Sequence, residues 1–131
     1  MKTPALAALA LALAAFAAAP VPASPAQPPA SRGQCFYVTQ ADGYRAADAR
    51  TVYARVSGRQ IWRIDLKAPC DGLVGGSQTL VVEPSGSGSI CGPLDLNLYA
   101  TSHGVRQRCL VGQLTRLSDA DAAALPAKLR P

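Results

Sequence analysis

Few side chains in this sequence have the types and spacing that enzyme chemistry requires. The only histidine, His103, lies in the polar run Thr101–Gly104, a predicted turn, and no nucleophile is marked beside it. Imidazole is a suitable general base near neutral pH, but an exposed turn residue is the plainer interpretation. Asp71 and Asp95 would supply carboxylates, although we expect them at turns and strand edges. These three residues are the candidates for an enzyme, or an enzyme inhibitor, with a site on its loops.

Other classes of catalytic and cofactor site lack their characteristic residues. Glu83 is the only glutamate, which excludes a glycosidase site built on two glutamates. The Gly/Ser run around Gly86 and Gly88 has no following lysine and helix of the kind that binds phosphate. We therefore predict no catalytic residue and no cofactor.

The four cysteines predict two disulfides. Cys35, Cys70, Cys91 and Cys109 are separated by 34, 20 and 17 residues, and an even count is typical of exported proteins. No C-x-x-C motif is present, so we expect neither a zinc site nor a thioredoxin-like redox pair. Three pairings are possible; we expect Cys35 to pair with Cys109 and Cys70 with Cys91. The first pair would tie the opening strand to the closing one.

The N-terminal segment has the layout of a secretory signal peptide. Met-Lys is followed by an almost pure Ala/Leu run and then by small residues and prolines. The apolar run falls short of the roughly 20 residues that span a bilayer, so a membrane anchor is the weaker interpretation. We expect cleavage after Ala26, with Ala19 and Ala23 as alternatives. Residues 1–26 are then the signal peptide and residues 27–34 a flexible Pro/Ala linker, which indicates a periplasmic or secreted protein.

The charge balance limits the classes of partner. The chain has 13 basic and 8 acidic residues and a net charge of +5. The basic residues are scattered without an aromatic-rich stripe, so we expect no nucleic-acid partner. We also expect no membrane span after signal cleavage. The plain interpretation is a solvated, soluble surface, and an envelope protein or an anionic envelope polymer is the candidate partner.

The clearest structural signal is the segment Arg50–Leu66, which predicts a β-hairpin. Two alternating runs, rich in β-branched and aromatic residues, flank Ser57–Arg59. A three-residue loop gathers the apolar residues on one side of the sheet, whereas a shift of one residue would mix them with arginine. The expected cross-strand pairs are Val56 with Gln60, Ala54 with Trp62, and Val52 with Ile64.

The other side of this hairpin carries Tyr53, Arg55 and Arg63. In the expected register Tyr53 lies opposite Arg63, where a cross-strand cation–π pair would contribute about 0.5 to 1 kcal/mol. The alternative interpretation is that Tyr53, Arg55 and Arg63 form a surface patch that binds a ligand.

Further strands are predicted on both sides of the hairpin. In Leu94–Tyr99 three leucines alternate with polar or tyrosine side chains, so we expect all three on one buried face. Gly112 predicts a bulge or a close approach of two backbones. The other predicted strands are Cys35–Val38, Gln78–Glu83 and Val105–Leu117.

A short helix is predicted near the C-terminus. Ser118 is a suitable N-cap, acidic residues follow in the first turn, and Pro126 ends the helix. Two turns of helix are not stable alone in water, so we expect it to pack on the sheet through Leu117, Ala122 and Leu125.

Taken together, several short motifs resemble a family of small exported Gram-negative bacterial proteins with four cysteines, classed as a domain of unknown function. The resemblance spans residues 35–126, implies a shared four-cysteine fold and an envelope location, and carries no activity. Its motifs are C-F at Cys35-Phe36, R-T-V-Y-x-R-V at Arg50–Val56, the aromatic-R-I-D-L run ending at Leu66, P-C at Pro69-Cys70, I-C-x-x-L-D at Ile90–Asp95, R-C at Arg108-Cys109, and L-S-x-A-D-A-A-A-L-P at Leu117–Pro126.

These observations predict one all-β domain at residues 35–126, a small barrel or sandwich of about six strands with a short C-terminal helix and two disulfides, followed by a tail at residues 127–131. The predicted function is a non-catalytic binding or cell-envelope accessory module. The alternative is the small secreted enzyme or enzyme inhibitor.

Overall fold

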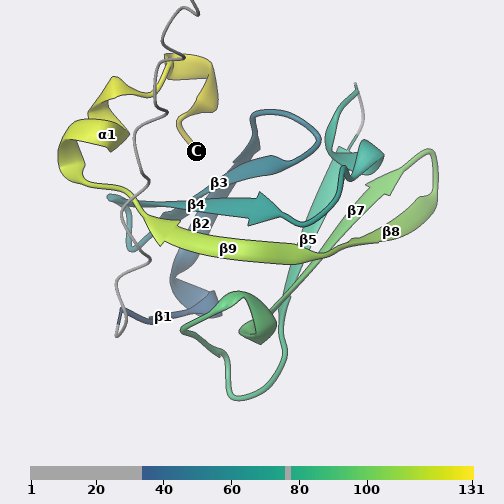
Figure 1. Cartoon of the computed structure of the whole chain (residues 1–131), viewed down its shortest axis with the longest axis horizontal. Coiled ribbons are helices and arrows are strands. Elements are labelled where there is room, and N and C mark those ends of the chain that lie inside the picture. Colours follow the sequence, from purple (N-terminus) through teal and green to yellow (C-terminus); the bar gives the residue numbers. More distant parts are fainter. Residues whose placement is uncertain (1–33, 76–77) are drawn as a thin grey trace, which may run out of the picture.

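The structure is a computed structural model that describes residues 34–75 and 78–131, and within them nine strands form three antiparallel sheets (Figure 1). The predicted signal peptide and the linker up to residue 33 lie outside the described residues. The strands are β1 Phe36–Tyr37, β2 Ala41–Ala46, β3 Thr51–Val56, β4 Gln60–Leu66, β5 Gln78–Pro84, β6 Ser89–Ile90, β7 Leu96–Ser102, β8 Val105–Cys109 and β9 Val111–Arg116.

The sheets have four, three and two strands, in the orders β2-β3-β4-β9, β5-β7-β8 and β1-β6. The predicted all-β class with a short C-terminal helix and two disulfides is confirmed. The described chain has more strands than the six or so expected. β2 and the two-residue β6 were not predicted, and the strand predicted over residues 105–117 is divided into β8 and β9. The helical elements are α1 Asp119–Ala124 and the 3-10 turns η1 Val38–Gln40, η2 Asp71–Leu73, η3 Pro93–Asp95 and η4 Ala127–Leu129.

The β3–β4 hairpin has the predicted register, with Val56 opposite Gln60, Ala54 opposite Trp62 and Val52 opposite Ile64. Its loop needs the left-handed backbone region at two successive positions, since φ is 52° at Ser57 and 75° at Gly58. The second position suits glycine, which has no Cβ to clash.

The core lies between the sheets and gathers the apolar stripe of the hairpin with residues from every sheet. Trp62 packs against Phe36 of β1 with 4.9 Å between ring centroids. Burial of these apolar side chains is the main favourable term in folding. The buried cluster is Phe36, Val52, Ala54, Val56, Trp62, Ile64, Leu66, Cys70, Leu73, Ile90, Leu96, Leu98, Ala100, Cys109, Val111 and Leu114.

The predicted strand over residues 105–117 is divided between two sheets. β8 pairs with β7, β9 pairs with β4, and Leu110 alone separates them, so the ribbon continues from one sheet into the other (Figure 1). Such a switch of sheets forms a corner of the fold. The bulge and close backbone approach predicted at Gly112 are confirmed. The register shifts there, and a Cβ at Gly112 would lie 3.3 Å from the Asp65 carbonyl oxygen.

The expectation that three leucines share one buried face is wrong for Leu94. Leu96 and Leu98 are buried, but Leu94 is 80% exposed. Pro93 starts η3, and the Asp95 carboxylate accepts hydrogen bonds from the backbone N–H groups of Cys91 and Gly92. This turn breaks the alternation before β7 begins.

Two disulfides are present, but the expected pairing is wrong. Cys35 pairs with Cys91, and Cys70 pairs with Cys109. The first pair follows from the β1–β6 ladder, in which Phe36 lies opposite Ile90 and brings the neighbouring cysteines together. The second pair forms because both cysteines lie next to β7. Cys70 precedes η2, which packs on β7, and Cys109 ends β8, which pairs with β7. On the loop-entropy model, sequence separations of 56 and 39 residues correspond to about 4 kcal/mol each.

The predicted C-terminal helix is confirmed as α1. Ser118 Oγ accepts a hydrogen bond from the Asp121 backbone N–H at 3.1 Å, as an N-cap should. Leu117, Ala122 and Leu125 are half-buried, while the other residues of α1 are exposed. No helix in the described part of the chain has the length and apolar character to cross a membrane.

Residues 117–131, which we call the C-terminal arm, pass over the outer face of the four-stranded sheet (Figure 1). At one end the Leu117 backbone N–H donates to the Ile61 carbonyl at 2.9 Å. At the other end the Arg55 guanidinium donates to the backbone oxygen of Pro131 at 2.7 Å. The Arg130 guanidinium donates to the carbonyl groups of Ala123 and Leu125, which closes the turn after α1.

Candidate functional site

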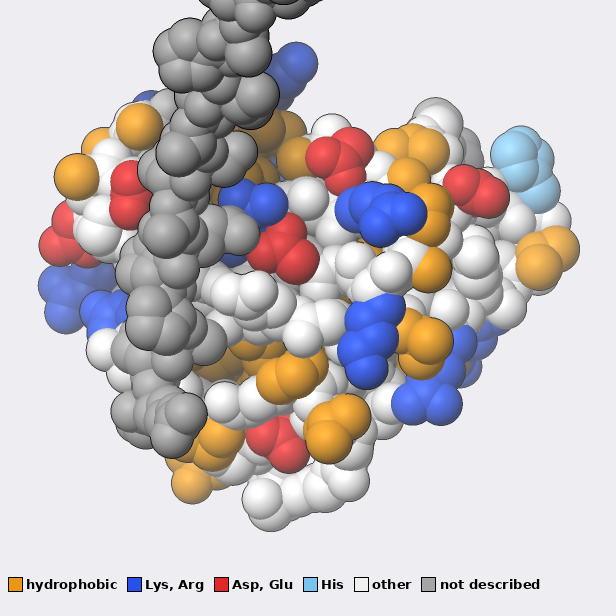
Figure 2. All heavy atoms as spheres, viewed as in Figure 1, with side chains coloured by type: hydrophobic (Ala, Val, Ile, Leu, Met, Phe, Trp, Pro, Cys, Tyr) orange, Lys and Arg blue, Asp and Glu red, His pale blue; other side chains and the backbone are white. Residues whose placement is uncertain are grey.

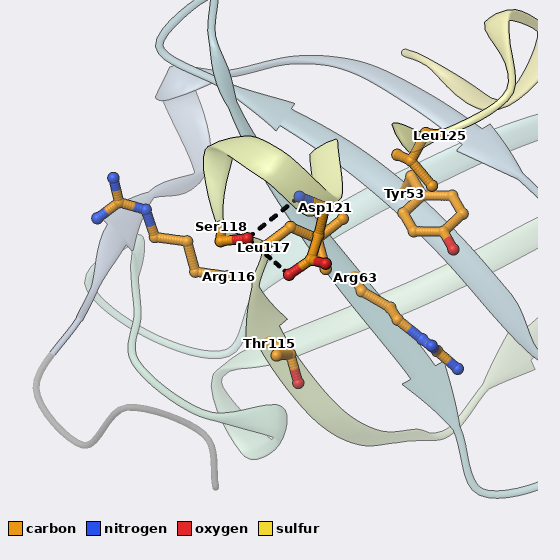
Figure 3. A pocket seen from close by; sticks show the side chains of 8 residues that line it. All are labelled: Tyr53, Arg63, Thr115, Arg116, Leu117, Ser118, Asp121 and Leu125. Atoms are coloured by element: carbon orange, nitrogen blue, oxygen red, sulfur yellow. Dashed lines mark hydrogen bonds between the residues drawn. The ribbon is translucent and has the colours of Figure 1, made fainter. Parts of the chain in front are cut away.

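A cavity of about 410 Å³ lies between the outer face of the four-stranded sheet and the C-terminal arm (Figure 3). Its volume falls in the range of about 300 to 1,000 Å³ that is usual for sites of small ligands. The residues around it are Tyr53, Arg63, Thr115, Arg116, Leu117, Ser118, Asp121 and Leu125.

The floor is a row of cross-strand neighbours. In the antiparallel register Tyr53 of β3 lies opposite Arg63 of β4, and Arg63 lies opposite Thr115 of β9. Directly opposed residues of a sheet share a face, so the three side chains stand on the same side. The alternation that buries Ala54 and Trp62 in the core thus places Tyr53 and Arg63 under the arm.

The arm supplies the walls. Leu117 and Leu125 contribute apolar surface, and Figure 3 shows Leu125 beside the Tyr53 ring. Ser118 and Asp121 contribute polar groups. The Ser118 hydroxyl donates to Asp121 Oδ2 at 2.6 Å and accepts from the Asp121 backbone N–H, so the helix cap fixes the carboxylate at the wall.

Tyr53 combines burial with an unpartnered hydroxyl. The residue is only 9% exposed, and its hydroxyl has no hydrogen-bond partner among the described residues. The ring is buried but the hydroxyl oxygen is not, since the one buried side-chain nitrogen or oxygen without a partner among the described residues is Trp62 Nε1. The hydroxyl opens into the cavity on the side where the Arg63 guanidinium extends (Figure 3).

Arg63 is only partly neutralised. Its Nε donates to Asp65 Oδ1 at 2.8 Å, two residues along the same strand. The terminal nitrogens of its guanidinium have no partner within the described residues. The expected cation–π pair of Tyr53 and Arg63 is not formed. A cation–π contact joins Arg106 to the Tyr99 ring instead, at 3.9 Å from the ring centroid. The bond to Asp65 directs the Arg63 guanidinium along its own strand instead.

The three residues of the predicted surface patch are divided. Tyr53 and Arg63 line the cavity, but Arg55 does not. Arg55 forms an ion pair with Asp42 at 2.7 Å and holds Pro131, so its charge is used within the protein. In this structure Arg55 anchors the arm.

The residues considered for catalysis lie on separate elements. His103 is exposed in the β7–β8 turn with φ of 51°, and its Nδ1 pairs with the Ser102 hydroxyl at 2.9 Å. Asp71 begins η2, and Asp95 closes the turn before β7. No hydrogen bond or ion pair between described residues joins any two of the three. The described chain also contains no group of three or more His, Cys, Asp and Glu side chains placed to hold a metal ion.

Sequence reasoning missed Thr115 and the wall residues as parts of one site. Thr115 meets Arg63 only because β9 pairs with β4, a contact between segments about fifty residues apart. Ser118 and Asp121 were interpreted as a helix cap, which they are. The predicted packing of Leu117 and Leu125 on the sheet was the one signal that brought the arm toward Tyr53.

A second, smaller cavity of about 240 Å³ lies at the edge of β2, where Tyr44, Leu73 and Leu80 meet. Burial, which disfavours the charged phenolate, raises the pKa of Tyr44 to about 12, and the negative charge of Asp42 adds to this. A phenol with this pKa stays protonated at neutral pH, so Tyr44 offers no base there.

The surface shows no single strongly basic field on the face seen in Figure 2. Lys and Arg side chains are spread over it among acidic, hydrophobic and other groups. Two of the arginines are paired with Asp42 and Glu83 at 2.7 Å. The hollow beside the hairpin loop, about 440 Å³ and lined by Arg59, Gln60, Arg116 and Asp119, has four charged or polar residues and no apolar wall. The cavity under the arm is therefore the better candidate site.

Comparison with known proteins gives a family but no activity. No curated protein and no solved structure matches the chain. One family model matches residues 1–130, nearly the whole sequence. On the strength of this match, the chain, which has two disulfides and three antiparallel sheets, belongs to the family of unknown function DUF6491.

Proposed function

We propose that this protein is an exported, non-catalytic binding module that holds a small organic ligand beneath the C-terminal arm. The observation that carries the proposal is Tyr53, which is 9% exposed and turns an unpartnered hydroxyl into a cavity of about 410 Å³. The hydroxyl is open to the cavity and free to donate, and a hydrogen bond from it to a ligand would contribute about 0.5 to 1.5 kcal/mol.

The lining favours binding over catalysis. It contains neither histidine nor cysteine, and its one carboxylate, on Asp121, takes part in the helix cap with Ser118. The roof formed by the arm also favours a small molecule over the envelope protein or anionic polymer that composition alone suggested. A polymer would need an open basic face.

Binding in the cavity is tested with a library of small ring-containing and branched-alkyl molecules, followed by two-dimensional NMR of the labelled protein. Chemical-shift changes should concentrate at the amides of Tyr53, Arg63, Thr115 and Leu125. Thr115→Trp fills the cavity from its floor and should abolish these changes. Thr101→Trp, on the outer face of the three-stranded sheet, is the matched control and should leave them unchanged.

Two results would overturn the proposed binding. In one, the library shifts no resonance of the cavity residues. In the other, molecules that bind the natural chain bind the folded Thr115→Trp variant equally well.

Export is supported by the composition of residues 1–26 and by the two disulfides, which persist in oxidising compartments. Fractionation of expressing cells and N-terminal sequencing test it. The expected result is a periplasmic or secreted protein that begins at Gln27. A cytoplasmic protein that retains Met1 and carries free thiols would contradict export.

A further inference from the structure

The cavity under the arm carries one charge of each sign. Arg63 extends along its floor, with its guanidinium directed away from Asp121, whose carboxylate lies at the wall (Figure 3). No ion pair among the described residues joins the two side chains, so neither neutralises the other. Each charge is supported from behind: Asp65 holds Arg63 Nε at 2.8 Å, and the Ser118 hydroxyl holds one carboxylate oxygen of Asp121 at 2.6 Å.

Each of these groups keeps hydrogen-bonding capacity that the described residues do not use. The terminal nitrogens of Arg63 are donors without a partner in the described chain, and a guanidinium matches the geometry of a carboxylate. The Tyr53 hydroxyl lies on the same side of the cavity in Figure 3 and is a further donor. Asp121 Oδ1 accepts no hydrogen bond from the described residues, so it is open to a cationic donor.

The remaining lining is apolar. Leu117, Leu125 and the Tyr53 ring form a surface suited to an alkyl or aromatic group. Arg116 contributes little positive charge, because its side chain points away from Tyr53 (Figure 3). The charged groups that meet the ligand are therefore Arg63 and Asp121.

Building on the proposed function, we propose that the ligand is a small zwitterion with an apolar side group, of the class of apolar α-amino acids. Its carboxylate bonds to Arg63 and the Tyr53 hydroxyl, its ammonium to Asp121, and its side group packs on Leu117 and Leu125. A ligand with a single charge would gain one of these contacts and place a like charge near the other group, which is unfavourable.

The class is tested on the full chain with L-leucine and L-phenylalanine as probes, compared with two derivatives of phenylalanine. N-acetyl-L-phenylalanine lacks the ammonium group and L-phenylalaninamide lacks the carboxylate. Isothermal titration and NMR should show that each derivative binds about tenfold more weakly or worse, as expected for the loss of a charge-assisted hydrogen bond.

Two substitutions assign the contacts. Asp121→Asn keeps an acceptor for Ser118 and should weaken phenylalanine about tenfold without weakening the N-acetyl derivative. Arg63→Gln should weaken phenylalanine similarly without weakening the amide. The matched controls are Asp119→Asn, in the same helical turn but outside the cavity, and Arg45→Gln, in the same cross-strand row on β2. Neither control should change the affinity.

The inference is overturned if either derivative binds in the cavity as tightly as the zwitterion, or if neither amino acid binds at about 10 mM. The first result would leave the proposed binding function standing with a different ligand class. The NMR test with the Thr115→Trp variant decides the proposed function separately, because that test does not depend on the charge of the ligand.

Discussion

The two larger sheets each place a tyrosine among arginines on their outer faces, and the two faces differ in how those groups are satisfied. On the three-stranded sheet the Arg106 guanidinium lies over the Tyr99 ring and pairs with Glu83 at 2.7 Å, while Arg108 donates to the Asn97 side chain at 2.7 Å. On the four-stranded sheet Tyr53 and the terminal nitrogens of Arg63 have no such partner in the described chain.

The comparison teaches that composition alone does not mark a binding face. Both faces contain the same residue types, but on the three-stranded sheet each arginine is used within the protein. On the four-stranded sheet the arm encloses groups that are left unpaired. Enclosure with incomplete pairing is what makes the second face a candidate site.

The largest effect should come from breaking the bridge that fastens the two regions together. Replacing Cys70 and Cys109 by alanine should lower the free energy of unfolding by about 4 kcal/mol or more, since the bridge closes a long loop and both cysteines are buried. Urea unfolding measures the loss. The Cys35/Cys91 double variant is the comparison: it also loses the closure of a long loop, but its cysteines are exposed, so it leaves no cavity in the core and its loss should be smaller. A larger loss in the Cys35/Cys91 double variant would contradict the prediction.

Removing the arm should affect one face only. A chain ending at Leu117 loses the packing of Leu125 and Ala122 on the sheet, and its stability should fall by about 2 kcal/mol. Amide exchange should accelerate in β3, β4 and β9 and stay unchanged in β5, β7 and β8. Arg55→Gln, which frees only the end of the arm, should give a smaller change in the same strands. Equal acceleration in all three sheets would mean that the arm stabilises the whole domain.

The two tyrosine–arginine pairs should differ in coupling energy. A double-mutant cycle of Tyr99→Leu with Arg106→Gln should give about 0.5 to 1 kcal/mol, the usual contribution of a cation–π contact. The matched cycle of Tyr53→Leu with Arg63→Gln should give a value near zero, because these side chains are cross-strand neighbours without that contact. Denaturant unfolding of the natural chain and the six variants measures both. Equal coupling in the two cycles would remove the distinction between the faces.

The prediction with the smallest effect on stability at neutral pH concerns Tyr44, at the edge of the four-stranded sheet, because this residue changes its charge only in alkaline solution. Burial first, and then Asp42, raise its pKa from 10.0 to about 12 in the folded protein. Its contribution to stability is therefore fully present below pH 10 and is lost as the pH rises from about 10 to about 12. Tyr44→Phe should remove this part of the alkaline destabilisation, measured by denaturant unfolding at successive pH values. A variant that loses as much stability as the natural chain over that range would show that Tyr44 does not titrate late.

Local signals predicted the local parts of the fold. The Arg50–Leu66 hairpin, its register, the Ser118 cap and the bulge at Gly112 all follow from residues close in sequence, and all are confirmed. The disulfide pairing was predicted wrongly because it depends on which strands become neighbours. Nothing in the short run at Cys35 indicates that β1 pairs with β6.

The candidate site was half predictable for the same reason. Alternation in the hairpin places Tyr53 and Arg63 on the outer face, whatever the rest of the chain does. Thr115 and Asp121 join them only through the β4–β9 pairing and the path of the arm. Arg55 has the same local pattern as Arg63, but its guanidinium forms an ion pair with Asp42 and donates a hydrogen bond to the backbone oxygen of Pro131, both outside the hairpin.

The interleaved disulfides determine which parts of the chain a protease can remove. With Cys35 joined to Cys91 and Cys70 to Cys109, one cut between Cys35 and Cys70 and another between Cys91 and Cys109 release no fragment, since the middle piece is bridged on both sides. The nested pairing would have freed that piece. The arm, however, begins after the last cysteine, and one cut near residue 117 detaches it from the covalent body. Proteolysis at this point would therefore remove the arm that covers the cavity, while the strands of the three sheets stay covalently connected.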